Sequence, residues 1–359
     1  MTLLINNHEQ ESLLEMKDCL NVLEDAIKEE ALGRAVSRNK SILHFPTDQP
    51  DLWYNYVSIE GGIAKTQYVA IRIRSDMERS VRNSNGSRVS EKYAVRAGSF
   101  CGLVLLYSAK NGELVAILND GYLQHMRVGA TYGLGAKYSS KKESRVLGLL
   151  GSGGMAEAQC QAYSLVRGIE LVKVYSPSKA HRDDFATRMS KKIDGIRVEA
   201  VEGPEQAIRG SDIVAACTTS LEPVLRKDWV EDGMHLSEVT QFEIGSNTLP
   251  RIDRFVHYRT GIPSHHSAAA SSVLPDVPSG TTPDQDFESK VDRGKVFSLH
   301  DVLLGKYPGR VNDSEVSLFF GEGTGVQFAA VGGRAYEEAR KAGLGKELPA
   351  EWFLQTIKT

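Results

Sequence analysis

A glycine-rich turn between an apolar run and a helix-like stretch is the strongest chemical pattern in the chain. Residues 145–156 read RVLGLLGSGGMA, which places Gly151, Gly153 and Ala156 in a GxGxxA pattern. The first glycine permits a tight turn, the second lets the backbone approach a pyrophosphate, and the alanine lets the next helix pack close to the strand. The pattern predicts a dinucleotide site; the alternative is a tight turn in some other α/β fold. The expected contacts are Gly151, Ser152, Gly153, Gly154 and Met155.

The segment after the next apolar run indicates which dinucleotide is bound. An NAD site usually has an acid about 20 residues beyond the glycines, where it accepts a hydrogen bond from the ribose. Residues 174–179 read VYSPSK, without an acid, and an arginine follows at position 182. Hydroxyls and cations suit a 2′-phosphate, so NADP(H) is preferred and NAD(H) is the alternative, unless the cations are simply solvated. The expected contacts are Ser176, Ser178, Lys179 and Arg182.

Composition limits the classes of protein to which the chain can belong. Its 359 residues are enough for two domains with a sizeable core. Hydrophobic residues make up 41% of the chain, and no run approaches the roughly 18 apolar residues that a membrane helix needs. The net charge is -3 without a basic block, which disfavours nucleic-acid binding. A small-molecule partner is therefore expected.

The N-terminus and the cysteines indicate the compartment. The sequence MTLLINNHEQ lacks the basic stretch and apolar run of a secretory signal. Cys19, Cys101, Cys160 and Cys217 form neither a CxxC pair nor a Cys/His cluster, so neither a disulfide framework nor a metal site is expected. These features predict a cytoplasmic protein with reduced thiols.

The first third of the chain has the texture of a mixed helix and antiparallel-strand domain. Apolar residues spaced by three and four predict one amphipathic helix over residues 10–32. Strands are predicted from β-branched and aromatic residues. They cover residues 53–59, 67–74, 101–108 and 113–119. The polar, glycine-containing residues 80–90 are predicted to be an exposed loop.

The rest of the chain alternates short apolar runs with helical patterns, which predicts a parallel sheet with crossover helices. The predicted strands cover residues 146–150, 171–175, 196–201, 213–217 and 234–239. Residues 263–287 are rich in Ser, Pro and Gly and are predicted to be a long surface loop, and a last helix is expected at 326–342. The fold class is α/β: a Rossmann-type parallel sheet domain plus an α+β domain.

The order of these landmarks resembles the ornithine cyclodeaminase/mu-crystallin family. The resemblance rests on five segments taken together. They are residues 102–121, LQHMRVGA at 123–130, the GSGGMA turn, RGSDIVAACTTS at 209–220 and DSEVSLF at 313–319. It implies a substrate-binding and dimerisation domain of residues 1–130 and 320–359, a Rossmann domain of residues 131–319, and a homodimer. It also implies cofactor contacts at Thr218 and Thr219.

The resemblance further implies arginines that hold a substrate carboxylate, at Arg38 and Arg127. A guanidinium suits this role because its planar fork binds a carboxylate in bidentate fashion. The family's catalytic lysine position is held here by Arg72, which cannot shuttle protons near neutral pH and is expected to act as an anion clamp. Lys65 replaces that lysine only if the strand register differs.

A second departure concerns the aspartate that the cyclodeaminases carry after the fifth Rossmann strand, since Phe242 holds the matching position. Glu238 ranks first as a replacement acid/base. The alternatives are His235, which more often is a structural residue at a strand start, and Glu243, which more often is a solvated loop acid.

These residues favour an NAD(P)-dependent oxidoreductase that acts on the C=N/CH–NH bond of a small carboxylated substrate, of the imine reductase or amino-acid dehydrogenase type. A preformed iminium needs no separate proton donor, so the two departures harm imine reduction less than deamination. The alternatives are a cyclodeaminase-like ammonia lyase with a retained nucleotide and a non-catalytic, NADP(H)-dependent binding protein.

Overall fold

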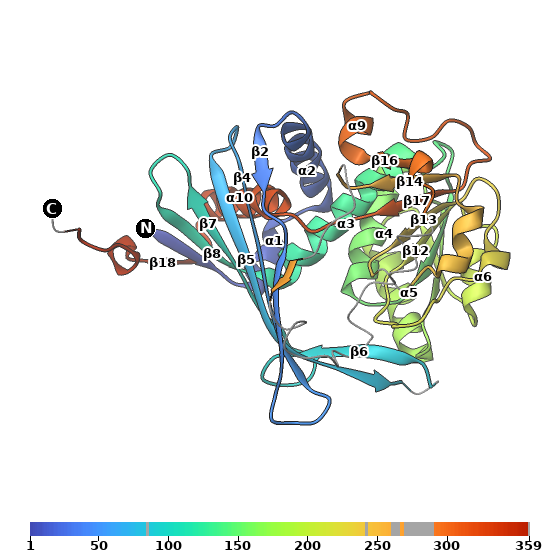
Figure 1. Cartoon of the computed structure of the whole chain (residues 1–359), viewed down its shortest axis with the longest axis horizontal. Helices are drawn as coiled ribbons and strands as arrows, with labels where there is room; N and C mark the ends of the chain where they lie inside the picture. The colour runs from blue at the N-terminus through green and yellow to red at the C-terminus, as the bar shows by residue number, and fades with distance from the viewer. Residues whose placement is uncertain (84–85, 241–242, 260–265, 269–290, 358–359) are drawn as a thin grey trace.

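A computed structural model describes residues 1–83, 86–240, 243–259, 266–268 and 291–357 of the chain. Two β-sheets lie side by side, and a long helix, α3 (Asp120–Ser139), runs from one to the other (Figure 1). Among the described residues, no helix is long and apolar enough to cross a membrane.

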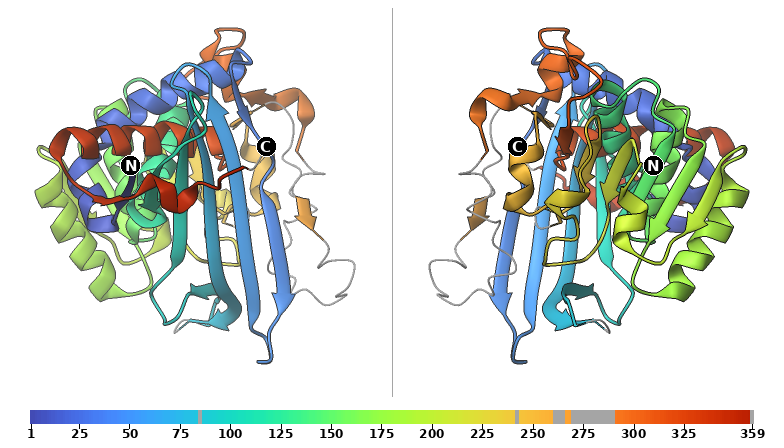
Figure 2. Two further views of the ribbon diagram at one scale, coloured as in Figure 1. Left: turned by 90° about the vertical axis from the view of Figure 1, so that its left-hand side faces the viewer. Right: turned by 90° about the vertical axis from the view of Figure 1, so that its right-hand side faces the viewer.

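The N-terminal sheet is mostly antiparallel and has ten strands in the order β15-β3-β4-β5-β7-β8-β1-β18, with β2 on β4 and β6 on β5. Figure 2 shows β4 and β5, which are its long central strands, from two sides. The strands are β1 (Thr2–Ile5), β2 (Ala35–Ser37), β3 (Ser41–Pro46), β4 (Trp53–Ile63), β5 (Tyr68–Arg82), β6 (Arg88–Tyr93), β7 (Cys101–Ser108), β8 (Leu114–Asn119), β15 (His266–Ala268) and β18 (Lys346–Leu348).

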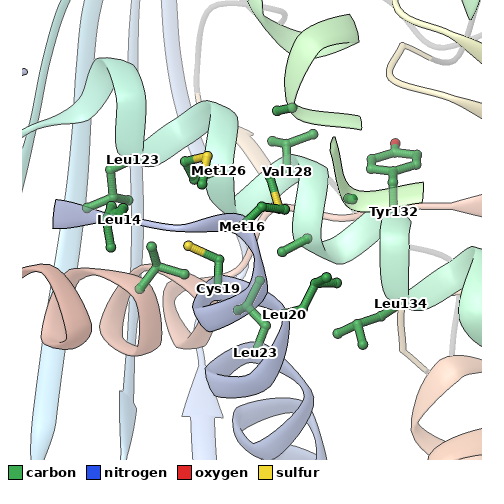
Figure 3. Close-up of a cluster of buried hydrophobic side chains, with 14 of the residues drawn as sticks. Leu14, Met16, Cys19, Leu20, Leu23, Leu123, Met126, Val128, Tyr132 and Leu134 are labelled. Carbon is green, nitrogen blue, oxygen red and sulfur yellow. The ribbon is translucent and has the colours of Figure 1, made fainter. Parts of the chain in front are cut away.

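Helices cover the inner face of this sheet, the face turned toward the second sheet. The single helix expected over residues 10–32 is instead two, α1 (Asn7–Leu13) and α2 (Met16–Ala31), because Leu14 and Glu15 adopt extended backbone. The apolar stripe of α2 packs beneath α3, as Figure 3 shows for Leu20, Leu23 and Leu134. The last helix, α10 (Gly325–Ala342), packs on β4, β5 and α2.

The second sheet is entirely parallel, in the order β11-β10-β9-β12-β13-β17-β14-β16, as the alternating pattern predicts for a Rossmann-type domain. Its strands are β9 (Val146–Leu150), β10 (Leu171–Tyr175), β11 (Arg197–Ala200), β12 (Ile213–Ala216), β13 (His235–Glu238), β14 (Arg254–His257), β16 (Val296–Ser298) and β17 (Ser317–Phe320). The helices are α4 (Gly154–Val166), α5 (Lys179–Lys192), α6 (Pro204–Ile208) and α9 (Leu299–Leu303). The 3-10 helices of this half are η1 (Lys227–Trp229), η2 (Ser246–Arg251) and η3 (Arg293–Lys295), whereas η4 (Ala350–Phe353) follows β18 of the N-terminal sheet.

The prediction of an exposed loop at residues 80–90 is wrong. Strand β5 continues to Arg82, and β6 returns beside it, so the segment is a hairpin that reaches under the second sheet (Figure 1). The amide of Ser90 donates to the carbonyl of Thr219 at 3.0 Å, in the loop that follows β12. Polar composition suggested a loop, but the ladder with β5 and this second contact satisfy the backbone of the segment as a strand.

Most of the surface loop expected at 263–287 lies outside the described residues. The described part, His266–Ala268, is the short strand β15, which adds to the edge of the N-terminal sheet in parallel with β3. At least this part of the segment therefore departs from the loop prediction.

Helices α3 and α4 join the two halves of the molecule through small residues. A Cβ at Gly129 would lie 2.7 Å from the backbone carbon of Ala158, and one at Gly133 would lie 2.8 Å from the Cβ of Ala162. The two contacts are four residues apart on both helices, so they lie on a single face of α3 and a single face of α4. Bare glycine backbones thus set the distance between α3 and α4, the first helix of the parallel sheet.

We expect Gly129→Ala to lower the free energy of unfolding by about 1–3 kcal/mol, because the new methyl group forces α3 away from α4. Gly332→Ala in the middle of α10 is the matched control, since a Cβ there meets its nearest side chains at 3.7–3.8 Å, an ordinary contact. The free energy of unfolding of this control should rise by ~0.5–1 kcal/mol, because alanine has a higher helix propensity than glycine. Urea denaturation measures both, and equal effects of the two substitutions would contradict the packing argument.

Candidate active site

The glycine-rich turn lies where β9 ends beside β12. Gly151 has φ of 111°, and a Cβ there would lie 2.4 Å from the carbonyl oxygen of Cys217 at the end of β12. Gly153 is exposed, and a Cβ on it would meet no atom within 4 Å. The first glycine is therefore required by the protein itself, whereas the space above Gly153 is open for a ligand.

The N-terminus of α4 offers free backbone donors to that space. Gly153 is the N-cap of α4, and no side chain caps the helix. The amides of the first turn, together with the positive end of the helix dipole, suit a pyrophosphate. Among the other expected contacts in this turn, Ser152 and Met155 are half-buried, and the Ser152 hydroxyl donates to the hydroxyl of Ser176 at 3.0 Å. The turn thus fits the dinucleotide that the sequence predicts.

His125 covers Gly154, although no motif in the sequence analysis singled this histidine out. A Cβ at Gly154 would lie 2.5 Å from Cε1 of the His125 ring. Burial lowers the pKa of His125, and the positive charge of Arg127 lowers it further, while Asp120 and Glu157 oppose the shift. A neutral imidazole on α3 therefore sits directly against the cofactor turn.

The residues after β10 are already engaged within the chain. The hydroxyl of Ser178 caps α5 by accepting from the amide of His181. Lys179 pairs with Asp183 at 2.6 Å, and Arg182 pairs with Glu202 at 2.6 Å. Arg182 also donates to the carbonyl of Ser176 at 3.1 Å. The cations expected to meet a 2′-phosphate thus have carboxylate partners, although Lys179 and Glu202 are largely exposed.

The interpretation of Glu243 as a solvated loop acid is wrong. It is fully buried, and its carboxylate accepts from the amides of Val239 and Thr240, each at 2.9 Å, and from the amide of Thr218. Burial raises its pKa in spite of these bonds. Glu243 therefore ties the loop after β12, with half-buried Thr218 and exposed Thr219, to the loop after β13.

Arg72 lies on the inner face of β5, in the register that the sequence reading assumed. Its Nε donates to Oδ2 of Asp120 at 2.8 Å, and Nη2 donates to the same oxygen. Both residues are buried, and Oδ1 of Asp120 has no hydrogen-bond partner among the described atoms. Lys65 lies instead in the turn between β4 and β5, 3.8 Å from Asp25, and is exposed.

Arg127 is a buried cation held by neutral groups. Its Nε and Nη2 donate to Oε1 of Gln124 at 3.1 and 2.8 Å, and Nη1 donates to Oε1 of Gln327 at 2.9 Å. Its guanidinium lies 4.9 Å from the ring centre of Phe328. Burial and the nearby Arg72 lower the pKa of Arg127 to about 10. It stays charged at neutral pH, and its full charge is available to an anion.

The remaining predicted residues do not all gather here. Arg38 is exposed, between β2 and β3, and its amide donates to the carbonyl of Glu60 at 3.0 Å. Glu238 is 2% exposed; its Oε2 accepts from the amide of Ile244 at 2.7 Å, and burial raises its pKa. His235 is buried, with its Nδ1 2.8 Å from the hydroxyl of Ser317, which agrees with the prediction of a structural residue at a strand start. Phe242 lies outside the described residues.

A further cation, Lys40, was not singled out in the sequence. It directly precedes β3 and is partly exposed, but loss of water from its ammonium lowers its pKa to about 8. Arg74, Lys92, Arg72 and Arg127 lower it further, in that order. No described cluster of His, Cys, Asp and Glu could hold a metal ion.

The profile of the ornithine cyclodeaminase/mu-crystallin family matches residues 83–343. The chain belongs to this family. A Delta(1)-pyrroline-2-carboxylate reductase of Bacillus cereus is 24% identical over 354 residues, covering 96% of this chain and 99% of that protein.

Two solved structures share the whole architecture of this family member. The Delta(1)-pyrroline-2-carboxylate reductase of Thermococcus litoralis, in complex with NADH and L-proline, has a TM-score of 0.78 and 25% identity and covers 97% of this chain and 100% of its own. An archaeal alanine dehydrogenase dimer with bound NAD has a TM-score of 0.75 and 23% identity and covers 97% and 99%.

We expect Gly153→Ala to weaken NAD(P)H binding about tenfold, equivalent to ~1.4 kcal/mol, because its methyl group enters the space left for the pyrophosphate. Folding should change by no more than about 1 kcal/mol, since only an N-cap glycine is altered. Gly203→Ala, at the N-cap of α6, is the control because a Cβ there also meets nothing within 4 Å. Fluorescence titration with nucleotide and thermal denaturation separate the two effects. Unchanged affinity in Gly153→Ala would place the pyrophosphate elsewhere.

Proposed function

We propose that the protein is an NAD(P)-dependent oxidoreductase that acts on the C=N/CH–NH bond of a small carboxylated substrate. The observation that carries the proposal is the composition of α3. This helix carries His125 against the cofactor turn and, two residues later, a buried Arg127 without an acidic partner among the described residues. An anion site and a dinucleotide site are thereby built on one rigid element.

In this proposal the bound nicotinamide supplies the hydride chemistry, and the chain supplies binding and orientation. Arg127 holds the substrate carboxylate, and Phe328 supports the guanidinium from below. Arg72, oriented by Asp120, is proposed as a second donor to the substrate in the same region. Arg38 is proposed as a further carboxylate contact and Glu238 as an acid/base, although Glu238 has no described contact with Arg72 or Arg127. Such fixed charges orient the reacting bond before hydride transfer.

The reductase proposal is favoured over the two alternatives. A cyclodeaminase needs groups that exchange protons with the substrate, whereas Arg72 donates to Asp120 and an arginine is not a proton shuttle. The names of the Bacillus cereus and Thermococcus litoralis relatives support reduction of a carboxylated cyclic imine. The same relatives, named as reductases, and the archaeal alanine dehydrogenase also favour catalysis over a non-catalytic binding protein.

The experiment is the loss of reduced-nicotinamide absorbance with NADPH and NADH separately. The substrates are cyclic imino acids, and 2-oxo acids mixed with ammonia or methylamine. We expect stoichiometric nucleotide oxidation with at least one carboxylated imine. Ammonia release from a diamino acid with only catalytic nucleotide would favour the cyclodeaminase instead. Tight nucleotide binding without turnover of any substrate would favour the binding protein.

For the cofactor we propose a preference for NADP(H) over NAD(H). The end of β10 presents the hydroxyls of Ser176 and Ser178 and carries no acid within the described segment that follows it directly. Lys179 is 68% exposed and Arg182 lies beside Ser176, so exchange of their carboxylate partners for a 2′-phosphate would need only side-chain motion. The relatives with bound NADH or NAD support nicotinamide binding without deciding this preference.

We expect Ser178→Asp to lower the affinity for NADPH about tenfold, ~1.4 kcal/mol, because its carboxylate repels the 2′-phosphate. Aspartate caps helices as well as serine does, so α5 should remain intact. Ser178→Asn keeps the cap without the charge and should change NADPH affinity much less. The ratio of kcat/KM for NADPH and NADH is the measurement; a wild type that prefers NADH contradicts the proposal at once.

The assembly and location are also proposals. The outer face of the N-terminal sheet, turned toward the viewer in the left view of Figure 2, exposes apolar side chains. They include Leu4, Leu43, Phe45, Val69 and Leu103, each 37–49% exposed. We propose that two copies of the chain pair through this face in a homodimer. Residues 1–130 and 320–359 are proposed to form the substrate-binding and dimerisation domain, and residues 131–319 the nucleotide-binding domain. Four free cysteines fit a cytoplasmic location.

A further inference from the structure

The inner face of the N-terminal sheet concentrates charge at one end. Residues directly opposite on antiparallel strands share a face, and so do alternate residues along a strand. Arg72 lies opposite Ile59, and Arg74 lies opposite Val57. Ile42 of β3 also lies opposite Val57, so Lys40, two residues earlier, lies on this face as well. Lys40 is thus two strands from Arg72, about 10 Å along the sheet between backbones.

Most cations in this region have an acidic partner. Arg72 pairs with Asp120, as described above. Arg74 lies 3.1 Å from the carboxylate of Asp76. Lys92 of β6 lies 3.1 Å from Glu78. Three acids therefore offset three cations, and all of these groups belong to β5, β6 and the start of α3.

Lys40 and Arg127 are the two cations of this cluster that lack an acid among the described residues. Within the described chain, the guanidinium of Arg127 donates only to the amide oxygens of Gln124 and Gln327. No ion pair of Lys40 is found in the described chain. The charge of Lys40 lowers the pKa of Glu322, but that carboxylate already accepts from Nε and Nη2 of Arg259 at 2.8 and 2.6 Å. Two uncompensated positive charges therefore face one region of the inner surface.

We propose that Lys40 and Arg127 form a two-point receptor for a dianion, so that the substrate is an imine or amine carrying two carboxylates. Arg127 holds the carboxylate next to the reacting carbon, and Lys40 holds the distal one. That the substrate has a reacting C=N bond follows from the proposed function. That it carries two negative charges is inferred only from the contacts of Lys40 and Arg127. Two like charges in one partly dehydrated region are unfavourable until an anion of matching charge binds.

The titration of Lys40 gives the receptor a pH dependence. Lys40 is faced by Arg72 and Arg74 from β5, Lys92 from β6, Arg127 from α3 and Glu322 from the segment after β17. With a free-protein pKa of about 8, Lys40 attracts a second carboxylate below that pH and loses this ability above it. Arg127, whose pKa is about 10, keeps the first carboxylate over the same range.

The test is equilibrium binding by calorimetry with full-length protein saturated with nucleotide. The probes are succinate and glutarate as dianions and propionate as the monoanion. We expect wild-type protein to bind one of the dianions about 30-fold more tightly than propionate, the lower end of what a buried, hydrogen-bonded charge pair contributes. That preference should fade as the pH rises through about 8.

Three variants separate the roles. Lys40→Met should abolish the preference for the dianion, and Arg127→Met should weaken dianion and monoanion alike. Lys65→Met is the matched control, since Lys65 is exposed in the β4–β5 turn and should leave both affinities unchanged. Lys40→Arg restores the charge and should restore part of the preference.

Stability gives an independent control on folding. Removing a dehydrated cation that faces other cations should raise the thermal midpoint of ligand-free Lys40→Met, by about 2 °C for ~1 kcal/mol in a chain of this size. A loss of binding in a stabilised variant then belongs to the receptor and not to misfolding.

Equal affinity of wild-type protein for dianions and propionate overturns the proposal. So does a Lys40→Met variant that keeps its dianion preference, or one that loses turnover with unchanged binding, which would make Lys40 a proton donor instead. Binding is measured without turnover, so the two proposals can fail separately. A dianion preference without any imine reduction would contradict the proposed function but support the dianion receptor.

Discussion

The close approach of α3 to α4 is the constraint on which the rest of the site depends. Gly129 and Gly133 leave no side chain between the helices, so Ala158 and Ala162 lie directly on the backbone of α3. Helix α4 begins at the cofactor turn, and α3 carries Arg127 and His125. One backbone contact thereby sets the distance between the buried cation Arg127 and the glycine-rich turn. The β5–β6 hairpin adds a second link, from Ser90 to Thr219 across the two sheets.

Electrostatics complete what packing begins. The protein neutralises Arg72 with Asp120 but surrounds Arg127 with glutamine oxygens, which satisfy hydrogen bonds without removing charge. Burial then lowers the pKa of Arg127 only to about 10, so the charge survives. Lys40 is closer to losing its proton. An interior that retains unpaired cations is less stable without a ligand than one that pairs them, and such groups are typical of binding and catalytic sites.

Sequence patterns predicted the elements whose pattern is local. The GxGxxA turn, the parallel strands β9 to β13 and α10 follow from apolar periodicity and from the conformational freedom of glycine, which neighbouring residues alone can express. Alternation along β5 did not decide whether the face that carries Arg72 is buried or solvated; packing against Asp120 of α3 decided it. The hairpin at residues 80–90 was not predictable either, because the Ser90–Thr219 contact that accompanies it joins residues from different halves of the chain.

The chain by itself therefore determined the fold class and the glycine-rich turn, and its family resemblance pointed to Arg127. Tertiary structure decided which charges remain free. Lys179 and Arg182 look like unpaired cations in the sequence but have carboxylate partners in the fold. Glu243 looks solvated in the sequence but is buried, and its carboxylate accepts hydrogen bonds from three backbone amides. Lys40 looks like a surface lysine but faces four other cations. The reason is that charge and burial depend on neighbours brought from distant parts of the sequence, whereas helical and strand periodicity depend only on residues a few positions away.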